Sequence, residues 1–292
     1  MRYIRHFCGM VILATLLIVF ASPSVVEAQD RSGELPRLSP NAAVSQTIGI
    51  TTVEVTYGRP SVRDREIFGG LVPYDRVWRT GADEATVITF SDPVTLGGSE
   101  VPAGSYALFT IPGEDEWTII LNDEPDQWGA YNYDSALNVH EFSTAPEEAS
   151  FREVMTFTFD DVTHESAVLT LHWDTVQVPI DISVDTDALV AQRAEEEIAN
   201  TTSWQKPLEF AGYALQRGVL LQQALGWAER SAELQENFNN LYVKARIQAA
   251  LGQYAEAMQT GERAVEKGEE AEDTPVTLDR LREDMRQWEE QI

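Results

Sequence analysis

The sequence predicts an all-β, sandwich-like antiparallel domain followed by an all-α stack of helical hairpins. Between Val44 and Val184, apolar and polar residues alternate with a period of two. This pattern is typical of strands that have one face on a core and the other in water. After Asp187 the chain changes to alanine, leucine, glutamate and glutamine at helical spacing. Of its 292 residues, 43% are apolar, which is enough for two modest cores.

The N-terminus has the three-part layout of a secretory signal. A short basic start precedes an almost wholly apolar run from Cys8 to Ala21, and Val26-Glu27-Ala28 offers small residues to a signal peptidase. The apolar run is shorter than the roughly 18 residues expected of a membrane-spanning helix. We therefore expect residues 1–28 to be a signal peptide cleaved after Ala28, and residues 29–43 to be a flexible lead-in. The mature protein would then be exported to the periplasm or the extracellular space, with no membrane anchor.

Composition narrows the possible chemistry and partners. The only cysteine, Cys8, lies within the expected signal, so the mature chain has no disulfide, thiol chemistry or cysteine–metal site. Aspartate and glutamate number 48 against 21 lysines and arginines, for a formal net charge of −27. A surface this negative repels nucleic acid and anionic membranes, which excludes both as partners. The acidic, lysine-poor composition also resembles that of proteins adapted to high salt, which suggests a halophilic habitat.

Short strands separated by turn signals predict the β-sandwich-like domain over residues 44–187. Glycine and proline pairs such as Gly97-Gly98 and Pro112-Gly113 mark the turns. Pro179 is expected at an edge or a bulge, because proline cannot donate to a ladder. The stretch from Asn122 to Ser150 is expected to be a long loop. The expected strands are centred on Val53–Tyr57, Thr86–Phe90, Ser105–Ile111, Trp117–Leu121, Met155–Phe159, Ala167–Trp173 and Val176–Val184.

Residues 188–292 contain two segments that resemble each other at a period near 34. Gly218 recurs as Gly252, and Ala224 recurs as Ala257. The pattern resembles a tetratricopeptide repeat, with glycine at the helix turn and small residues where paired helices touch. It departs from that repeat at Leu241, where tryptophan is usual, and in lacking the terminal proline. A final helix over about residues 276–290 would cap the stack.

A cluster of arginines stands out in the otherwise acidic β domain, and it has two interpretations. It could form an anion site, with planar guanidinium groups that bind a carboxylate or phosphate. Alternatively, the arginines could pair internally with nearby carboxylates or stack on aromatic rings. The cluster comprises Arg59, Arg63, Arg65, Arg76 and Arg79; the possible internal partners are Asp64, Glu66, Asp75, Asp83, Glu84, Tyr57, Tyr74 and Trp78.

Aromatic residues and amides in Trp128–Tyr133 form a second candidate site. Exposed aromatics beside amides suit a sugar ring or a peptide, but the rings could instead fold back as a lid on the sandwich. Together with the arginine cluster, this segment gives the expected ligand-binding residues. They are Arg59, Arg63, Tyr74, Arg79, Glu84, Trp128, Tyr131 and Tyr133.

The sequence contains no catalytic or cofactor motif. It lacks a nucleophile elbow, a P-loop, a zinc-protease helix and a dinucleotide fingerprint. His140, His164 and His172 are too scattered to show ligand spacing, so we expect no metal and no cofactor. Among 48 acidic residues, Asp83 and Glu84 are the only acid/base candidates that we single out, with Arg79 orienting a substrate.

Six long and unusual strings occur in order along the chain: Ser45–Gly49, Tyr57–Val62, Ile67–Tyr74, Val77–Thr86, Pro102–Phe109 and Trp128–Tyr133. These strings resemble a bacterial family catalogued as domain of unknown function 2911, found mainly in exported proteins of Bacteroidetes and relatives. The resemblance covers about residues 36–186 and implies a β domain that often ends in short tetratricopeptide-like helices. It implies no activity and no catalytic residues.

These observations favour a non-enzymatic, exported envelope protein. The β domain is expected to bind a small ligand or an extracellular polymer, and the helices to hold a protein segment. One alternative is a hydrolase or isomerase that uses a carboxylate near Arg79. The other is a structural assembly scaffold.

Overall fold

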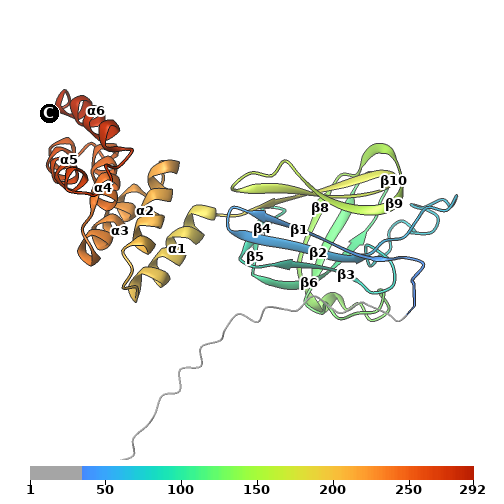
Figure 1. Ribbon diagram of the computed structural model, residues 1–292. Coiled ribbons are helices and arrows are strands. Elements are labelled where there is room, and N and C mark those ends of the chain that lie inside the picture. The colour runs from blue at the N-terminus through green and yellow to red at the C-terminus, as the bar shows by residue number, and fades with distance from the viewer. Residues whose placement is uncertain (1–34) are drawn as a thin grey trace, which may run out of the picture. The chain divides into compact units, whose positions relative to one another are not determined.

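The computed structural model describes residues 35–292, in which two antiparallel sheets are followed by six helices (Figure 1). This order confirms the predicted fold class, a β domain followed by a helical stack. The expected signal peptide, residues 1–28, lies outside the described residues. The first strand begins at Asn41 rather than at Val44, within the segment expected to lead into the domain.

The β domain consists of a larger and a smaller sheet. Neighbouring strands in both sheets are antiparallel, and strands β1 to β8 are joined mainly by short turns. The larger sheet has the order β1 (Asn41–Ile48), β2 (Thr51–Gly58), β3 (Thr86–Phe90), β6 (Gly104–Ile111), β7 (Trp117–Asn122) and β8 (Asn138–Thr144). The smaller sheet has the order β5 (Ser99–Val101), β4 (Val94–Leu96), β10 (Ser166–Ser183) and β9 (Glu147–Asp160).

The core lies between the inner faces of the two sheets, as the period-two pattern requires. Val55 of β2 and Phe157 of β9 belong to the same buried cluster. The Tyr57 hydroxyl accepts a hydrogen bond from the Phe157 backbone N–H over 3.1 Å, which links the sheets directly. Trp78 and Trp173 stack at 6.0 Å between ring centroids in the same core. Apolar alternation along the strands therefore specifies a sandwich.

The two strands expected over Ala167–Trp173 and Val176–Val184 belong to one long strand, β10. The register with β9 shifts on both sides of Asp174, whose φ of 56° lies in the left-handed region, so the strand continues through a bulge. β10 is an internal strand, yet Pro179 fits because it lies between the last β9 pair at Gln177 and the first β4 pair at Ile182. Neither ladder requires the N–H that proline lacks.

The prediction of a long loop from Asn122 to Ser150 is wrong. Strand β8 pairs with β7 in the middle of this stretch, and β9 already begins at Glu147. The half-buried positions of β8 include Asn138, His140 and Thr144, which are polar, so the strand has almost no apolar alternation. A strand of this composition gives little signal in the sequence.

The helical region consists of two consecutive helical hairpins and flanking helices. The hairpins turn at Gly218 and Gly252, whose φ values of 72° and 77° are left-handed and favour glycine. Ala224 and Ala257 are fully buried where helices pack. In the described part of the chain, no helix is long and apolar enough to cross a membrane. The helices are α1 (Thr186–Ala199), α2 (Gln205–Arg217), α3 (Leu221–Leu234), α4 (Phe238–Ala250), α5 (Tyr254–Glu269) and α6 (Leu278–Glu289).

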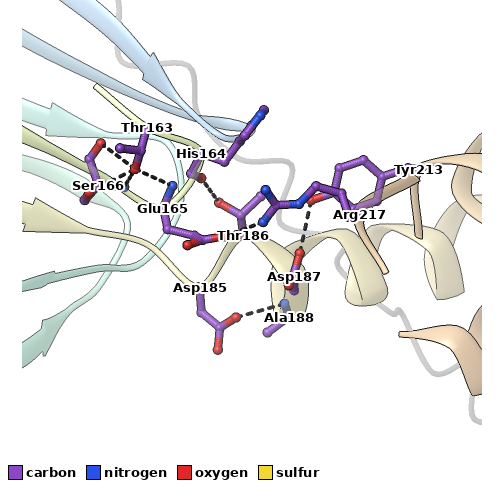
Figure 2. Close-up of polar contacts among 10 residues, drawn as sticks. All are labelled: Thr163, His164, Glu165, Ser166, Asp185, Thr186, Asp187, Ala188, Tyr213 and Arg217. Atoms are coloured by element: carbon purple, nitrogen blue, oxygen red, sulfur yellow. Dashed lines mark hydrogen bonds and ion pairs between the residues drawn. The ribbon is translucent and has the colours of Figure 1, made fainter. Parts of the chain in front are cut away.

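Polar contacts connect the turn before β10 to the first two helices (Figure 2). The Thr186 hydroxyl at the start of α1 donates to the His164 carbonyl, and Arg217 of α2 forms an ion pair with Glu165. The Tyr213 hydroxyl donates to Asp187 over 3.1 Å. Only Val184 and Asp185 separate β10 from α1, so the helices follow the strand without a linker.

The Tyr213 contact predicts a dependence of stability on alkaline pH. Burial raises the pKa of the Tyr213 hydroxyl, and its hydrogen bond to Asp187 raises it further. The folded state therefore holds this proton more tightly than the unfolded chain does. The resulting stabilisation is complete below about pH 10, the unfolded pKa, and is lost as the pH rises through the folded pKa.

We expect the thermal midpoint, followed by circular dichroism, to fall more steeply between about pH 9 and 11 in the wild type than in Tyr213→Phe. The Tyr213→Phe variant is the matched control because it keeps the ring and removes only the titrating hydroxyl. Identical slopes for the two proteins would contradict the prediction.

Candidate binding site around Arg79

Three of the clustered arginines hold main chain in place. Arg59 donates from Nε to the Met155 carbonyl over 3.0 Å and from Nη2 to the Thr156 hydroxyl over 2.9 Å. Arg65 donates to the carbonyls of Val62 and Ser61, and Arg63 donates to the carbonyl of Leu38. Within residues 35–292, none of the five arginines forms an ion pair. The internal carboxylate pairing expected as one interpretation is therefore not what these residues do.

Arg79 differs from these three arginines because no described residue accepts a hydrogen bond from its guanidinium. The side chain is half-buried, and its Nε is fully buried without a partner among residues 35–292. The Nη1 atom lies beside Gly129, 3.9 Å from the position that a Cβ there would occupy. A buried donor without an acceptor is costly, so the Arg79 guanidinium is less well satisfied than those of the other three arginines.

The backbone around Arg79 is held in an unusual conformation. Thr80 and Asp83 have left-handed φ values of 50° and 64°; this conformation is strained for the β-branched threonine, whereas aspartate tolerates it. Buried hydrogen bonds hold the turn: the Thr86 hydroxyl donates to the Thr80 carbonyl over 2.8 Å, and the Thr80 hydroxyl contacts that of Thr110 at 3.2 Å. The turn is therefore fixed from inside the domain.

Backbone hydrogen bonds bring the segment after β7 against this turn. The Gly129 N–H donates to the Asp83 carbonyl over 3.0 Å, and the Ala85 N–H donates to the Gln127 carbonyl over 2.9 Å. Glu84 and Trp128 form an isolated β-bridge between these bonds. Two segments that are far apart in the sequence thus become neighbours.

The aromatic residues of the second segment divide into exposed and packed side chains. Trp128 and Tyr131 are 58% and 84% exposed, whereas Tyr133 packs edge-on against Phe109 at 5.1 Å between ring centroids. The Tyr131 ring lies against Gly129, with its Cε2 atom 3.0 Å from the position that a Cβ at this glycine would occupy. We call Arg79, Trp128 and Tyr131 the Arg79 surface. The lid interpretation holds for Tyr133 alone.

Glu84 forms an ion pair that the sequence did not predict. Arg37 donates from Nη1 to both carboxylate oxygens of Glu84, over 2.8 and 2.6 Å, with both side chains partly buried. The hydrogen bond to Glu84 raises the pKa of Arg37. Arg37 lies in the segment expected as a lead-in, where no pattern identifies its partner.

The structure therefore brings together only part of the expected ligand-binding set. Arg79 and Tyr131 both lie against Gly129, Trp128 is exposed at the preceding position, and Asp83 and Glu84 are in the adjoining turn. Arg59 and Arg63 direct their guanidinium groups to main chain elsewhere, and Tyr133 is packed inward. Tyr74 lines a different cleft, together with Phe68 and Trp117.

The histidines take part in local hydrogen bonds. Arg152 Nε donates to His172 Nδ1 over 3.0 Å, so the proton of that ring is on Nε2, which donates to the Ser150 carbonyl over 2.8 Å. His140 contacts the Leu96 carbonyl through Nε2. Among the residues that the structure describes, no group of three histidine, cysteine or acidic side chains could hold a metal ion.

The fold and the Arg79 surface define a two-sheet β domain in which Arg79, without a partner among residues 35–292, lies beside Gly129 together with the exposed ring of Tyr131. Residues 39–182 match the family described as "Protein of unknown function (DUF2911)". The match spans both sheets and supports the family resemblance of the β domain, while the helices lie outside it. No curated protein and no solved structure matches the chain.

Proposed function

We propose that this protein is an exported binding module whose β domain takes an anionic ligand with a flat ring, such as an acidic sugar of an extracellular polymer. The observation that carries the proposal is the Arg79 guanidinium, which has no partner among residues 35–292 and lies beside Gly129, against which the exposed ring of Tyr131 packs. The exposed Trp128 precedes that glycine in the same segment. Export rests on the signal-like N-terminus alone.

The chemistry of the two groups is complementary. A guanidinium presents parallel N–H donors that match a carboxylate or phosphate. An indole or phenol ring offers an apolar face on which a sugar ring can lie, with its hydroxyl edges left in water. Carboxylates outnumber lysines and arginines in this chain, so most cationic side chains could find a carboxylate partner. A guanidinium that has no carboxylate partner is therefore available to an anionic ligand.

We also propose that the helical hairpins, which resemble tetratricopeptide repeats, hold a protein segment. The supporting observation is a hollow of about 370 Å³ between α5 and α6. Met258, Val265 and Met285 form its apolar walls. Adaptable methionine side chains suit a surface that accepts an apolar peptide side chain. Co-purification with and without residues 189–292 tests this proposal, and identical sets of bound proteins would contradict it.

The hydrolase or isomerase alternative is less well supported. An acid/base carboxylate must reach the substrate proton directly or through one water molecule. Arg37 contacts both oxygens of Glu84, so this carboxylate would have to give up its ion pair before it could act as an acid or a base. Binding needs none of these groups to be released.

The test is calorimetric titration with uronic acid and phosphorylated oligosaccharides, each paired with its neutral counterpart, such as oligogalacturonate and its methyl ester. We expect at least one charged ligand to bind and its neutral counterpart to bind much more weakly. Arg79→Gln should weaken binding about 10- to 100-fold, the effect of losing a charge-assisted hydrogen bond. Arg76→Gln is the matched control, because Arg76 is exposed and comes from the same cluster.

The Arg59→Ala variant tests whether Arg59 contacts the ligand or only stabilises the fold. Its hydrogen bonds to β9 predict a loss of about 1–3 kcal/mol in the free energy of unfolding, with unchanged affinity per folded molecule. Failure of every charged ligand to bind, or equal affinity of the wild type and Arg79→Gln, would overturn the proposed function.

A further inference from the structure

A cleft in the β domain is lined by none of the residues of the Arg79 surface. It is a cleft of about 280 Å³ between the Phe68–Tyr74 loop, the turn after β6, and the start of β9 where it pairs with the middle of β10. We call it the Tyr74 cleft. Its chemistry is set by three aromatic and three acidic residues: Phe68, Tyr74, Trp117, Glu114, Glu147 and Glu148.

The aromatic residues form a fixed part of the cleft. Phe68 meets Trp117 edge-on at 5.0 Å between ring centroids, and Trp117 is 1% exposed within the sandwich core. Tyr74 is held by the close approach of Gly69, where a Cβ would lie 2.9 Å from the ring. The Asp75 N–H donates to the Pro112 carbonyl over 2.9 Å, which ties this loop to the turn after β6. These rings are therefore in place before a ligand arrives.

The polar part of the cleft is negative. Glu148 faces Val176 across the β9–β10 ladder, and Glu147 faces Gln177, whose Nε2 donates to it over 2.7 Å. Glu114 reaches the cleft from the turn after β6. In the described part of the chain, none of these three glutamates forms an ion pair with lysine or arginine.

We infer that the Tyr74 cleft binds a substituted ammonium ion. Aromatic rings attract a cation through their π electrons, and carboxylates at the rim add to this attraction. The same carboxylates repel an anion. A bare metal ion is a poor match, because the aromatic walls supply no oxygen or nitrogen ligands in the usual number. An ammonium ion with alkyl groups uses both the apolar walls and the charged rim.

The test compares choline with 3,3-dimethylbutan-1-ol, which has the same shape without the charge, by ligand-observed NMR titration of the full mature chain. We expect choline to bind at low ionic strength, the alcohol to bind much more weakly, and added salt to weaken choline binding. Tyr74→Leu keeps the apolar bulk and removes the π system, so it should weaken binding about 2- to 5-fold. Glu148→Gln should weaken it by a similar factor.

Glu100→Gln is the control for overall charge, because Glu100 is exposed on β5 and is not among the residues that line the cleft. It changes the net charge as much as Glu148→Gln does, but it should leave the affinity unchanged. Three results would each overturn the inference: no choline binding, equal binding of choline and the alcohol, or equal effects of Glu100→Gln and Glu148→Gln. Circular dichroism of each variant confirms that the domain remains folded.

Discussion

Replacement of Trp173 by alanine should lower the free energy of unfolding by about 3–5 kcal/mol, the usual effect of removing a large aromatic side chain from a core. Trp173 is completely buried, stacks on Trp78 at 6.0 Å with an interplanar angle of 19°, and lies 6.0 Å from Phe68. Its Nε1 has no hydrogen-bond partner among the described residues. The loss therefore reflects packing and the cavity left behind, with no broken hydrogen bond.

Urea denaturation followed by circular dichroism measures this effect. Trp128→Ala is the matched control, because it removes the same side chain from a surface position that is 58% exposed. It should change the free energy of unfolding by no more than about 0.5 kcal/mol. Similar losses for the two variants would mean that Trp173 does not lie at the centre of the sandwich.

The second large effect is expected from Gly58→Ala, at the end of β2. A Cβ at this position would lie 2.2 Å from the Ala82 carbonyl oxygen, which belongs to the backbone and cannot rotate away. Overpacking of this kind destabilises by about 1–3 kcal/mol. Because Ala82 lies in the turn that carries Arg79 and Glu84, we also expect the substitution to displace that turn and to weaken ligand binding at the Arg79 surface.

Gly212→Ala is the control for Gly58→Ala and should have the opposite effect on the free energy of unfolding. Gly212 lies within α2 with open space around its Cα, so alanine should stabilise the helix by about 0.5–1 kcal/mol. Thermal denaturation of both variants shows in one experiment whether each substitution raises or lowers the stability. A neutral Gly58→Ala variant would show that β2 and the turn at Ala82 are not in close contact.

Much of the fold could be predicted because apolar residues follow the period of each element. The bounds of β3, Thr86–Phe90, agree with the expected strand, and the turns at Gly218 and Gly252 fall where the repeat places them. The missed strand, β8, has polar residues at three of its four half-buried positions. The continuity of β10 was missed because its bulge at Asp174 resembles a break between two strands.

The candidate site was less predictable than the fold. Composition identified the arginine cluster, but only tertiary contacts distinguish Arg59, which donates to β9, from Arg79, which lacks a partner among the described residues. The division between exposed Tyr131 and packed Tyr133 likewise depends on Phe109, which is distant in sequence. A pattern of residue types shows which side chains are unusual, whereas their partners depend on the fold.

The direct passage from β10 into α1 has a mechanical consequence. Tension applied to the helices by a bound protein would act along β10, since only two residues intervene. Antiparallel ladder bonds run perpendicular to their strands, so a pull along β10 loads its bonds to β9 together in shear. β10 would then transmit force between a partner bound to the β domain and a partner bound to the helices.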